Sequence, residues 1–229
     1  MTGRPADALI SGLPVALEIG PKRRVFAQAV GWPGWCRPAR DEARATDALV
    51  RYADRYRHAV GTLGAPLGIG PPVPTIVERV VGTATTDFGA PDAILASDRG
   101  PLAAGEPQKL AAFLDACWST FDAALGSVPS RDRGLKPEVG RAPETVRLHL
   151  LDALRAYATW LAKPVPRLDQ ARVEESEREI RAFVRAAVSA LPTGVAFANE
   201  RHPGPYMVRR ECWHALDHAW ELEDRFSRT

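Results

Sequence analysis

Three prolines, Pro107, Pro143 and Pro205, open long helical patterns in the C-terminal half of the chain, and they constrain the fold more than any other feature. A helix tolerates proline in its first turn, where the missing N–H would have no partner, but not in its interior. The apolar spacing after each proline, with one further such stretch, predicts helices over residues 107–125, 143–162, 169–191 and 205–226. Four helices with short connections favour an antiparallel four-helix bundle.

The N-terminal part of the chain has the pattern of a small α/β unit. Two runs that carry β-branched and aromatic residues, VALEIG and RVFAQAV, flank a PKRR turn, which predicts a β-hairpin. We expect a further strand at Trp35 and Cys36, a helix from Asp41 to Gly61, and a last strand in TIVERVVGTATT. The predicted fold class is therefore α+β, with a small α/β domain before the helical bundle.

The two parts are separated by the segment DFGAPDAILASDRGPLAAGE, which has no sustained period and is rich in turn residues. Such a composition is typical of a linker. The length of 229 residues fits one large or two modest domains. We therefore predict two domains, at residues 1–95 and 105–229.

The composition argues against several classes of protein. With 45% hydrophobic and 25% charged residues, the chain has the balance of a folded globular protein. A net charge of +2 provides no large field, so neither nucleic acid nor a membrane is expected as a partner. The start of the chain lacks a signal-peptide pattern, and no run reaches about 18 apolar residues, so a cytoplasmic protein is expected. Three cysteines, an odd number, argue against a disulfide framework.

His214 and His218 are four residues apart in the segment CWHALDHAWELEDR. In a helix this spacing projects both imidazoles from one face, one turn apart, so that a single helix can offer a metal two ligands. A helical wheel places the pair away from the main apolar stripe, in a sector shared with Met207, Glu211, Glu221 and Arg225. A solvated face whose histidines bind nothing is therefore an alternative interpretation.

His149 lies instead on the apolar stripe of the helix predicted at 143–162. A buried imidazole needs a partner for each ring nitrogen, and in an ordinary core a backbone carbonyl or a tyrosine supplies it. Metal sites in helical bundles are built from side chains on facing helices, so this histidine is also placed to join the HxxxH pair. Three nitrogen ligands leave at least one coordination position for water or substrate.

Several charged residues near the histidines are weaker candidates for a role in chemistry. Glu221 follows His218 by three residues, so it can reach the same site as a base or as a partner of the histidine, whereas Asp217 faces another sector. Candidates for binding an anionic substrate are Arg225, Arg209 and Arg210. For each of these residues, a solvated surface charge is the alternative.

Three further residues of the same segment are expected to be structural. Trp213 and Trp220 are predicted to lie in the core rather than against a cofactor. Cys212 is predicted to be a small buried residue, and a role as a nucleophile with a histidine partner is the less favoured alternative.

The segments RRECWHALDHAWELEDR and HLLDALRAYATWL resemble the metal-binding segments of the DinB-like superfamily, over about residues 105–226. In that family one histidine of the second helix joins an HxxxH pair in the fourth. The resemblance assigns these positions to His149 and to the pair His214 and His218. It implies a bound divalent metal (zinc, nickel or manganese) and, as in some relatives, a low-molecular-weight thiol as a second cofactor.

The resemblance implies two alternative functions. The first is a metal-dependent enzyme acting on a small molecule, as a thiol-dependent S-transferase or a metal-dependent hydrolase, with Glu221 as the candidate catalytic residue and Arg225 as the candidate substrate-binding residue. The second is a non-catalytic binding or regulatory protein, antitoxin-like or stress-associated, in which the metal only stabilises the bundle. Fold and ligands together leave open whether the chain is an enzyme. A homodimer is expected, since DinB-like bundles often dimerise.

The N-terminal part resembles the small α/β domain of HicB-like proteins over about residues 14–85. The residues that carry this likeness are Trp32, Pro33, Gly34, Asp41, Glu42 and Ala43. The resemblance implies a dimerisation or lid role, since no separate DNA-binding element follows. A basic cluster, Lys22, Arg23 and Arg24, lies in the expected hairpin turn, where a solvated turn explains it better than phosphate binding.

Overall fold

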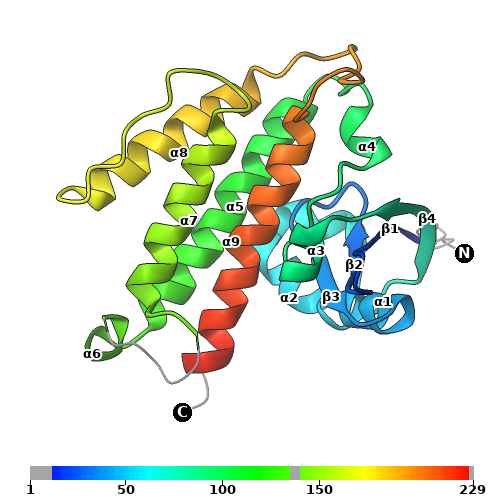
Figure 1. Cartoon of the computed structure of the whole chain (residues 1–229), viewed down its shortest axis with the longest axis horizontal. Coiled ribbons are helices and arrows are strands. Elements are labelled where there is room, and N and C mark those ends of the chain that lie inside the picture. Colours follow the sequence, from blue (N-terminus) through cyan, green and yellow to red (C-terminus); the bar gives the residue numbers. More distant parts are fainter. Residues whose placement is uncertain (1–11, 135–139, 227–229) are drawn as a thin grey trace, which may run out of the picture.

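The computed structural model describes residues 12–134 and 140–226, and its N-terminal part is built on a four-stranded mixed sheet (Figure 1). The strands are β1 (Leu13–Ile19), β2 (Val25–Ala29), β3 (Cys36–Ala39) and β4 (Pro74–Val81). Their order is β3-β2-β1-β4, and only the β1–β4 pair is parallel. The predicted hairpin and the strand at Cys36 are therefore confirmed, while the last strand is shorter than expected and ends at Val81.

Two short helices and a 3-10 helix follow β3. They are α1 (Glu42–Arg51), α2 (Ala53–Val60) and η1 (Gly61–Leu67). Asp41 caps α1 as expected, because its Oδ1 accepts a hydrogen bond of 2.8 Å from the N–H of Arg44. The single helix predicted from Asp41 to Gly61 is interrupted at Tyr52, which ends α1 and precedes α2.

Trp35 and Tyr56 fasten these helices to the sheet. Their rings stack with centroids 4.9 Å apart, and both side chains are buried. Trp35 Nε1 donates to the carbonyl of Leu49 at 2.9 Å, and the Tyr56 hydroxyl donates to the carbonyl of Pro33 at 2.9 Å. Each ring therefore contributes apolar area to the core while its polar atom is satisfied.

The segment after β4, which the sequence predicts to be a linker between two domains, is packed against the rest of the protein. It contains α3 (Ala84–Phe88) and α4 (Ala96–Arg99). Asp98 is buried and forms an ion pair of 2.6 Å with Arg209 of the last helix. Buried Glu18 of β1 accepts a hydrogen bond of 2.6 Å from the Thr86 hydroxyl and one of 2.8 Å from the N–H of Asp92. A turn-rich composition does not reveal such long-range partners.

The C-terminal part is helical, as predicted. Its helices are α5 (Glu106–Ser127), α6 (Ser130–Arg133), α7 (Pro143–Ala158), α8 (Val173–Ser189) and α9 (Gly204–Phe226). Helices α5 and α7 each contact both α8 and α9 (Figure 1). The α+β class is thus confirmed, with a sheet followed by a helical region. No helix in the described part of the chain is both long and apolar enough to cross a membrane.

Helix α9 lies at the centre of the molecule, between the other long helices and the sheet (Figure 1). Every residue from Gly204 to Leu216 is buried. The sheet reaches α9 through Phe26, whose ring centroid lies 6.1 Å from that of Trp213. The prediction that His214 lies outside the core is therefore wrong, because the first half of α9 has neighbours on several sides and keeps no solvated face.

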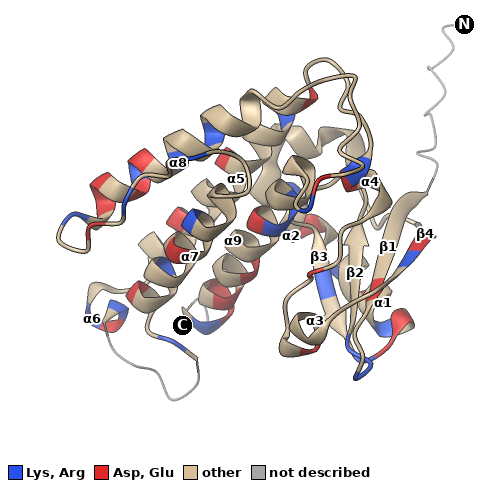
Figure 2. Ribbon diagram, turned by 45° about the horizontal axis from the view of Figure 1, so that its top comes forward, with Lys and Arg blue, Asp and Glu red and all other residues tan. Residues whose placement is uncertain are grey.

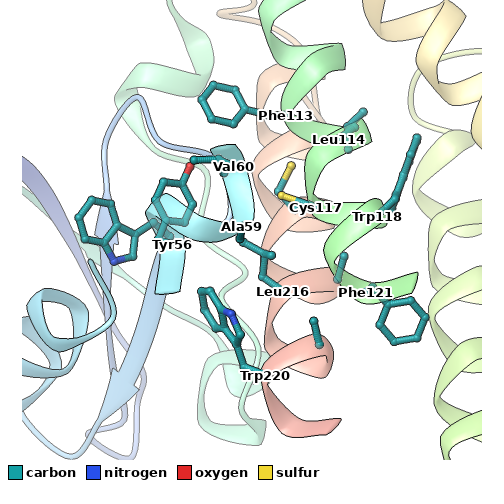
Figure 3. Packing of buried hydrophobic residues seen from close by; sticks show 14 of the residues in the cluster. Tyr56, Ala59, Val60, Phe113, Leu114, Cys117, Trp118, Phe121, Leu216 and Trp220 are labelled. Carbon is teal, nitrogen blue, oxygen red and sulfur yellow. The ribbon is translucent and has the colours of Figure 1, made fainter. Parts of the chain in front are cut away.

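One buried cluster includes residues of both halves of the chain. In Figure 3, Tyr56 of α2 lies near Phe113 of α5 and Leu216 of α9, and all three belong to this cluster. The division into domains at residues 1–95 and 105–229 stays a prediction, because contact between two parts does not decide whether each folds alone. Within those ranges, residues 1–11, 135–139 and 227–229 lie outside the described residues.

Gly34 tests how tightly the sheet is packed on α9. Its φ is +89°, and an added Cβ would come within 3.0 Å of the Cys212 Cβ and the Leu216 Cδ1. We expect Gly34→Ala to lower the free energy of unfolding by about 2–4 kcal/mol, through left-handed strain and overpacking. Gly31→Ala is the matched control, because φ there is +81° but no atom lies within 4 Å of the added Cβ. Urea unfolding that shows equal losses for both variants would contradict this packing argument.

Candidate metal centre

The three predicted ligands meet between α7 and α9. His149 comes from the middle of α7, and His214 and His218 come from successive turns of α9. One ring nitrogen from each lies within 4.8 Å of the others. The ring centroid of His149 lies 4.9 Å from that of His214 and 5.5 Å from that of His218. The structure therefore brings together the three histidines that the sequence singled out.

The distance between two of the nitrogens fits a shared metal ion. Nε2 of His149 and Nε2 of His214 are 3.2 Å apart. Two metal–nitrogen bonds of about 2.0–2.1 Å at a tetrahedral angle place their nitrogens roughly 3.3 Å apart. A direct N–H···N hydrogen bond between the rings is the alternative for this pair, but it does not account for the third imidazole beside it.

Glu221 orients His218. The Nδ1 of His218 lies 2.8 Å from Oε2 of Glu221, and because a carboxylate only accepts, Nδ1 carries the proton and Nε2 is left with the lone pair. Metal-binding histidines are commonly held by a carboxylate in this way. The bond to His218 is the largest of the effects that lower the pKa of Glu221. The predicted partnership of Glu221 with the histidine is thus present.

Arg225 is engaged within the protein. Its Nη1 donates to Oε1 of Glu221 at 3.0 Å, and its Nη2 donates to the carbonyl of Arg141 at 3.1 Å. The carbonyl of Arg141 lies just before α7 begins, and no feature of the sequence indicated this contact. Arg225 therefore supports Glu221 and does not stand free for an anionic substrate.

Burial favours the neutral form of two of the three histidines, His214 and His149. The pKa of His214 lies well below its usual value, first because the ring is desolvated and then because His218 and His149 are close. Desolvation is also the main cause that lowers the pKa of His149, followed by the positive charge of Arg141. A neutral imidazole has the lone pair that a metal needs, so the site is ready to bind a cation at neutral pH.

The three rings differ in their access to solvent. His214 is buried, whereas His149 and His218 are partly exposed. His149 was expected on the core stripe, so its partial exposure corrects that placement. Two of the three candidate ligands are therefore within reach of solvent. Nδ1 of His214 is buried without a hydrogen-bond partner among the described residues.

The other charged candidates have structural partners. Asp217 pairs with Arg37 of β3 at 2.9 Å and, as predicted, does not share the site of the histidines. Arg209 pairs with Asp98 at 2.6 Å, and Arg210 pairs with Asp92 at 2.9 Å. Both arginines are buried, so the candidate role in binding an anionic substrate gives way to a role in holding the α3–α4 segment on α9.

The remaining candidates in α9 lie in the core. Trp213 and Trp220 are buried, as expected. Cys212 is fully buried, and desolvation raises the pKa of its thiol well above the usual value. A nucleophilic cysteine needs a thiolate that substrate can reach, so the alternative of a Cys212 nucleophile is wrong.

Glu211 was expected beside the histidines on a polar face but is buried one turn before His214. Trp118 Nε1 donates to its Oε1 at 2.9 Å, while Oε2 has no partner among the described residues. Desolvation is the main cause that raises the pKa of Glu211 to about 8. The carboxyl group is therefore protonated at neutral pH and adds no negative charge to the site.

No family model matches the chain, and no match was found to a curated protein or to a solved structure. The case for a metal site consequently depends on the geometry of the three histidines and their neighbours.

The protonation of Glu211 predicts an unusual pH dependence. Its folded pKa of about 8 exceeds the usual value of 4.5, so its contribution to stability is present at low pH and is lost as the pH rises toward about 8. We expect Glu211→Gln to stabilise the protein by on the order of 3 kcal/mol at pH 8.5 and to have little effect at pH 5.

Glu177 of α8 provides the matched control for this measurement. It is also buried, but it pairs with Arg147 at 2.7 Å and with Arg181 at 2.6 Å, so Glu177→Gln should destabilise the protein at pH 8.5. Denaturant unfolding at both pH values gives the comparison. A loss of stability for Glu211→Gln at pH 8.5 would show that Glu211 is ionised and paired.

Proposed function

We propose that the chain is a divalent-metal-binding protein whose ion is held by His149, His214 and His218. The observation that carries this proposal is the 3.2 Å approach of the Nε2 atoms of His149 and His214, with His218 in reach of the same point. Imidazole ligands, one of them oriented by Glu221, suit zinc or nickel, and manganese is included because of the resemblance to the DinB-like superfamily. The identity of the native ion is left to experiment.

We further propose that α5, α7, α8 and α9 form a four-helix bundle of the DinB-like type. The support is the placement of one ligand on the second long helix and two on the fourth, which corresponds to the pattern of that superfamily. The HicB-like character of the N-terminal sheet and its helices is proposed on its sequence likeness alone, and this likeness favours a role in dimerisation or as a lid.

The chemistry that we propose is a thiol-dependent S-transfer or a metal-dependent hydrolysis on a small molecule. A divalent cation held by three imidazoles supplies a Lewis acid that lowers the pKa of a water or a thiol. Glu221 fixes the tautomer and direction of His218, and Arg225 keeps Glu221 in place. In this assignment Glu221 is a positioning residue, because its carboxylate is directed at the histidine.

A second candidate function is a non-catalytic, regulatory protein with a structural metal. The observation in its favour is the engagement of Arg225, the candidate for substrate binding, with Glu221 and with the carbonyl of Arg141. Binding of a small thiol to the metal-loaded protein separates the two functions. A thiol that perturbs the spectrum of a cobalt- or nickel-loaded sample favours the enzyme, and an unchanged spectrum favours the structural role.

Metal content is the direct test of the site. We expect purified protein to bind about one zinc, nickel or manganese ion per chain. We expect His214→Ala to abolish binding, because it removes the buried ligand, whose ring centroid lies 4.9 Å from that of His149 and 5.0 Å from that of His218. His58→Ala is the control, since His58 is exposed on α2 and belongs to no cluster of ligands among the described residues. Wild-type protein that takes up none of the three metals would defeat the proposal.

The pH dependence of metal binding tests which atoms coordinate the ion. Histidine must be neutral to bind, and burial lowers the pKa of His149 and of His214 from 6.5, so affinity should hold at pH 7 and fall steeply once the pH drops below the usual histidine value. Competition with a metal indicator at low free metal gives the affinity. Affinity that is flat to pH 5 and collapses near pH 4 would assign the coordination to carboxylates.

A further inference from the structure

A hollow on the surface of the N-terminal part is lined mainly by basic residues that come from separate stretches of the sequence. The turn between β1 and β2 forms one wall, and the start and outer face of α1 form the other. The hollow measures about 1120 Å³. The cationic residues that line it are Lys22, Arg23, Arg24, Arg40, Arg44 and Arg51. Figure 2 shows the turn in blue next to α1.

The cations outweigh the acids in this hollow. Six of its lining residues are basic and two, Asp41 and Asp47, are acidic, so its formal charge is +4, whereas the whole chain carries only +2. Asp41 is already occupied, because it caps α1 and pairs with Arg44. Of the described ion pairs, none involves the side chains of Lys22 or Arg51. Arg44 is therefore engaged with Asp41, whereas the side chains of Lys22 and Arg51 face the hollow without an acidic partner among the described residues.

The arrangement fits an extended polyanion better than a single small anion. Arg44 and Arg51 lie seven residues apart on α1, which places them about 10 Å apart along the helix axis. About 10 Å of nucleic-acid duplex carries roughly six phosphates. Five of the six cations are arginines, whose planar guanidinium groups bind phosphate in a bidentate manner.

The composition of the hollow also indicates how such a ligand would be held. Its remaining lining residues are Pro38, Ala39 and Ala48, so it offers neither an aromatic ring for stacking a base nor a large apolar side chain for insertion into a bilayer. Single strands are usually held by stacking on aromatic side chains, and membranes by apolar insertion combined with charge. A paired nucleic acid contacted at its phosphates needs neither.

We propose that this hollow binds the phosphate backbone of duplex nucleic acid without reading its sequence. The low net charge of the chain leads us to expect no nucleic-acid partner. The positive charge is concentrated in the hollow, however, and the rest of the chain carries a formal −2 (+2 minus +4), so the net charge hides it. The proposal is independent of the metal centre, since none of the three histidines lines the hollow.

The test is binding of the full-length protein to fluorescein-labelled 20-base-pair duplexes of two unrelated sequences, followed by anisotropy. With about four phosphates neutralised, affinity should fall about a hundredfold between about 50 and 200 mM salt, and equally for both sequences. Lys22→Glu with Arg51→Glu should weaken binding at least about tenfold at about 50 mM salt. The slope of log affinity against log salt concentration should then correspond to about two fewer neutralised phosphates.

The control variant is Arg131→Glu with Arg178→Glu, which changes the net charge equally at exposed positions of α6 and α8. It should retain the wild-type affinity and salt dependence. Three outcomes would overturn the proposal: no duplex binding at about 50 mM salt, equal losses in both double variants, or capture by phosphatidylserine vesicles that duplex does not compete away. Thermal unfolding of each variant confirms that a loss of binding is not a loss of fold.

Discussion

The burial of α9 on several sides is the constraint on which the rest of the structure depends. A buried polar group without a partner costs about 1–3 kcal/mol, and a buried charge costs more, yet the first three turns of α9 contain Arg209, Arg210, Glu211 and His214. Together they reach three different parts of the structure. Arg209 and Arg210 hold the α3–α4 segment, Glu211 meets Trp118 of α5, and His214 meets His149 of α7. The polar residues of α9 therefore specify how its neighbours are arranged around it.

The candidate metal centre follows from the same constraint. Desolvation makes the charged form of His214 unfavourable, and the ring that results is a good ligand. The ion pairs of α9 with the α3–α4 segment lie on other turns, so metal binding does not compete with the interactions that fasten the two halves of the chain. Folding and coordination thus use separate groups of one helix.

Local features of the fold were predictable from sequence, whereas the environment of α9 was not. The caps, the first-turn prolines and the hairpin turn act over a few residues, so Asp41, Pro143 and the β1–β2 turn are where the patterns place them. The HxxxH spacing likewise predicted two rings on one face. A helical wheel, however, assumes that a helix is buried on one side only, whereas the first half of α9 is buried on several sides. The packing of the α3–α4 segment depends on pairs such as Arg209 and Asp98, which are 111 residues apart, and no local pattern encodes them.

The contact between Arg225 and the carbonyl of Arg141 has a consequence for how a metal would arrive. It ties the last turns of α9 to the chain just before α7, beside the point where the ligands of both helices meet. The conformational entropy that is lost when the two helices come together is then lost during folding and not when the metal binds. An ion would then meet ligands that are already close together, so that its binding would require little further ordering of the two helices. Such a site would exchange its metal with small chelators while the protein stays folded.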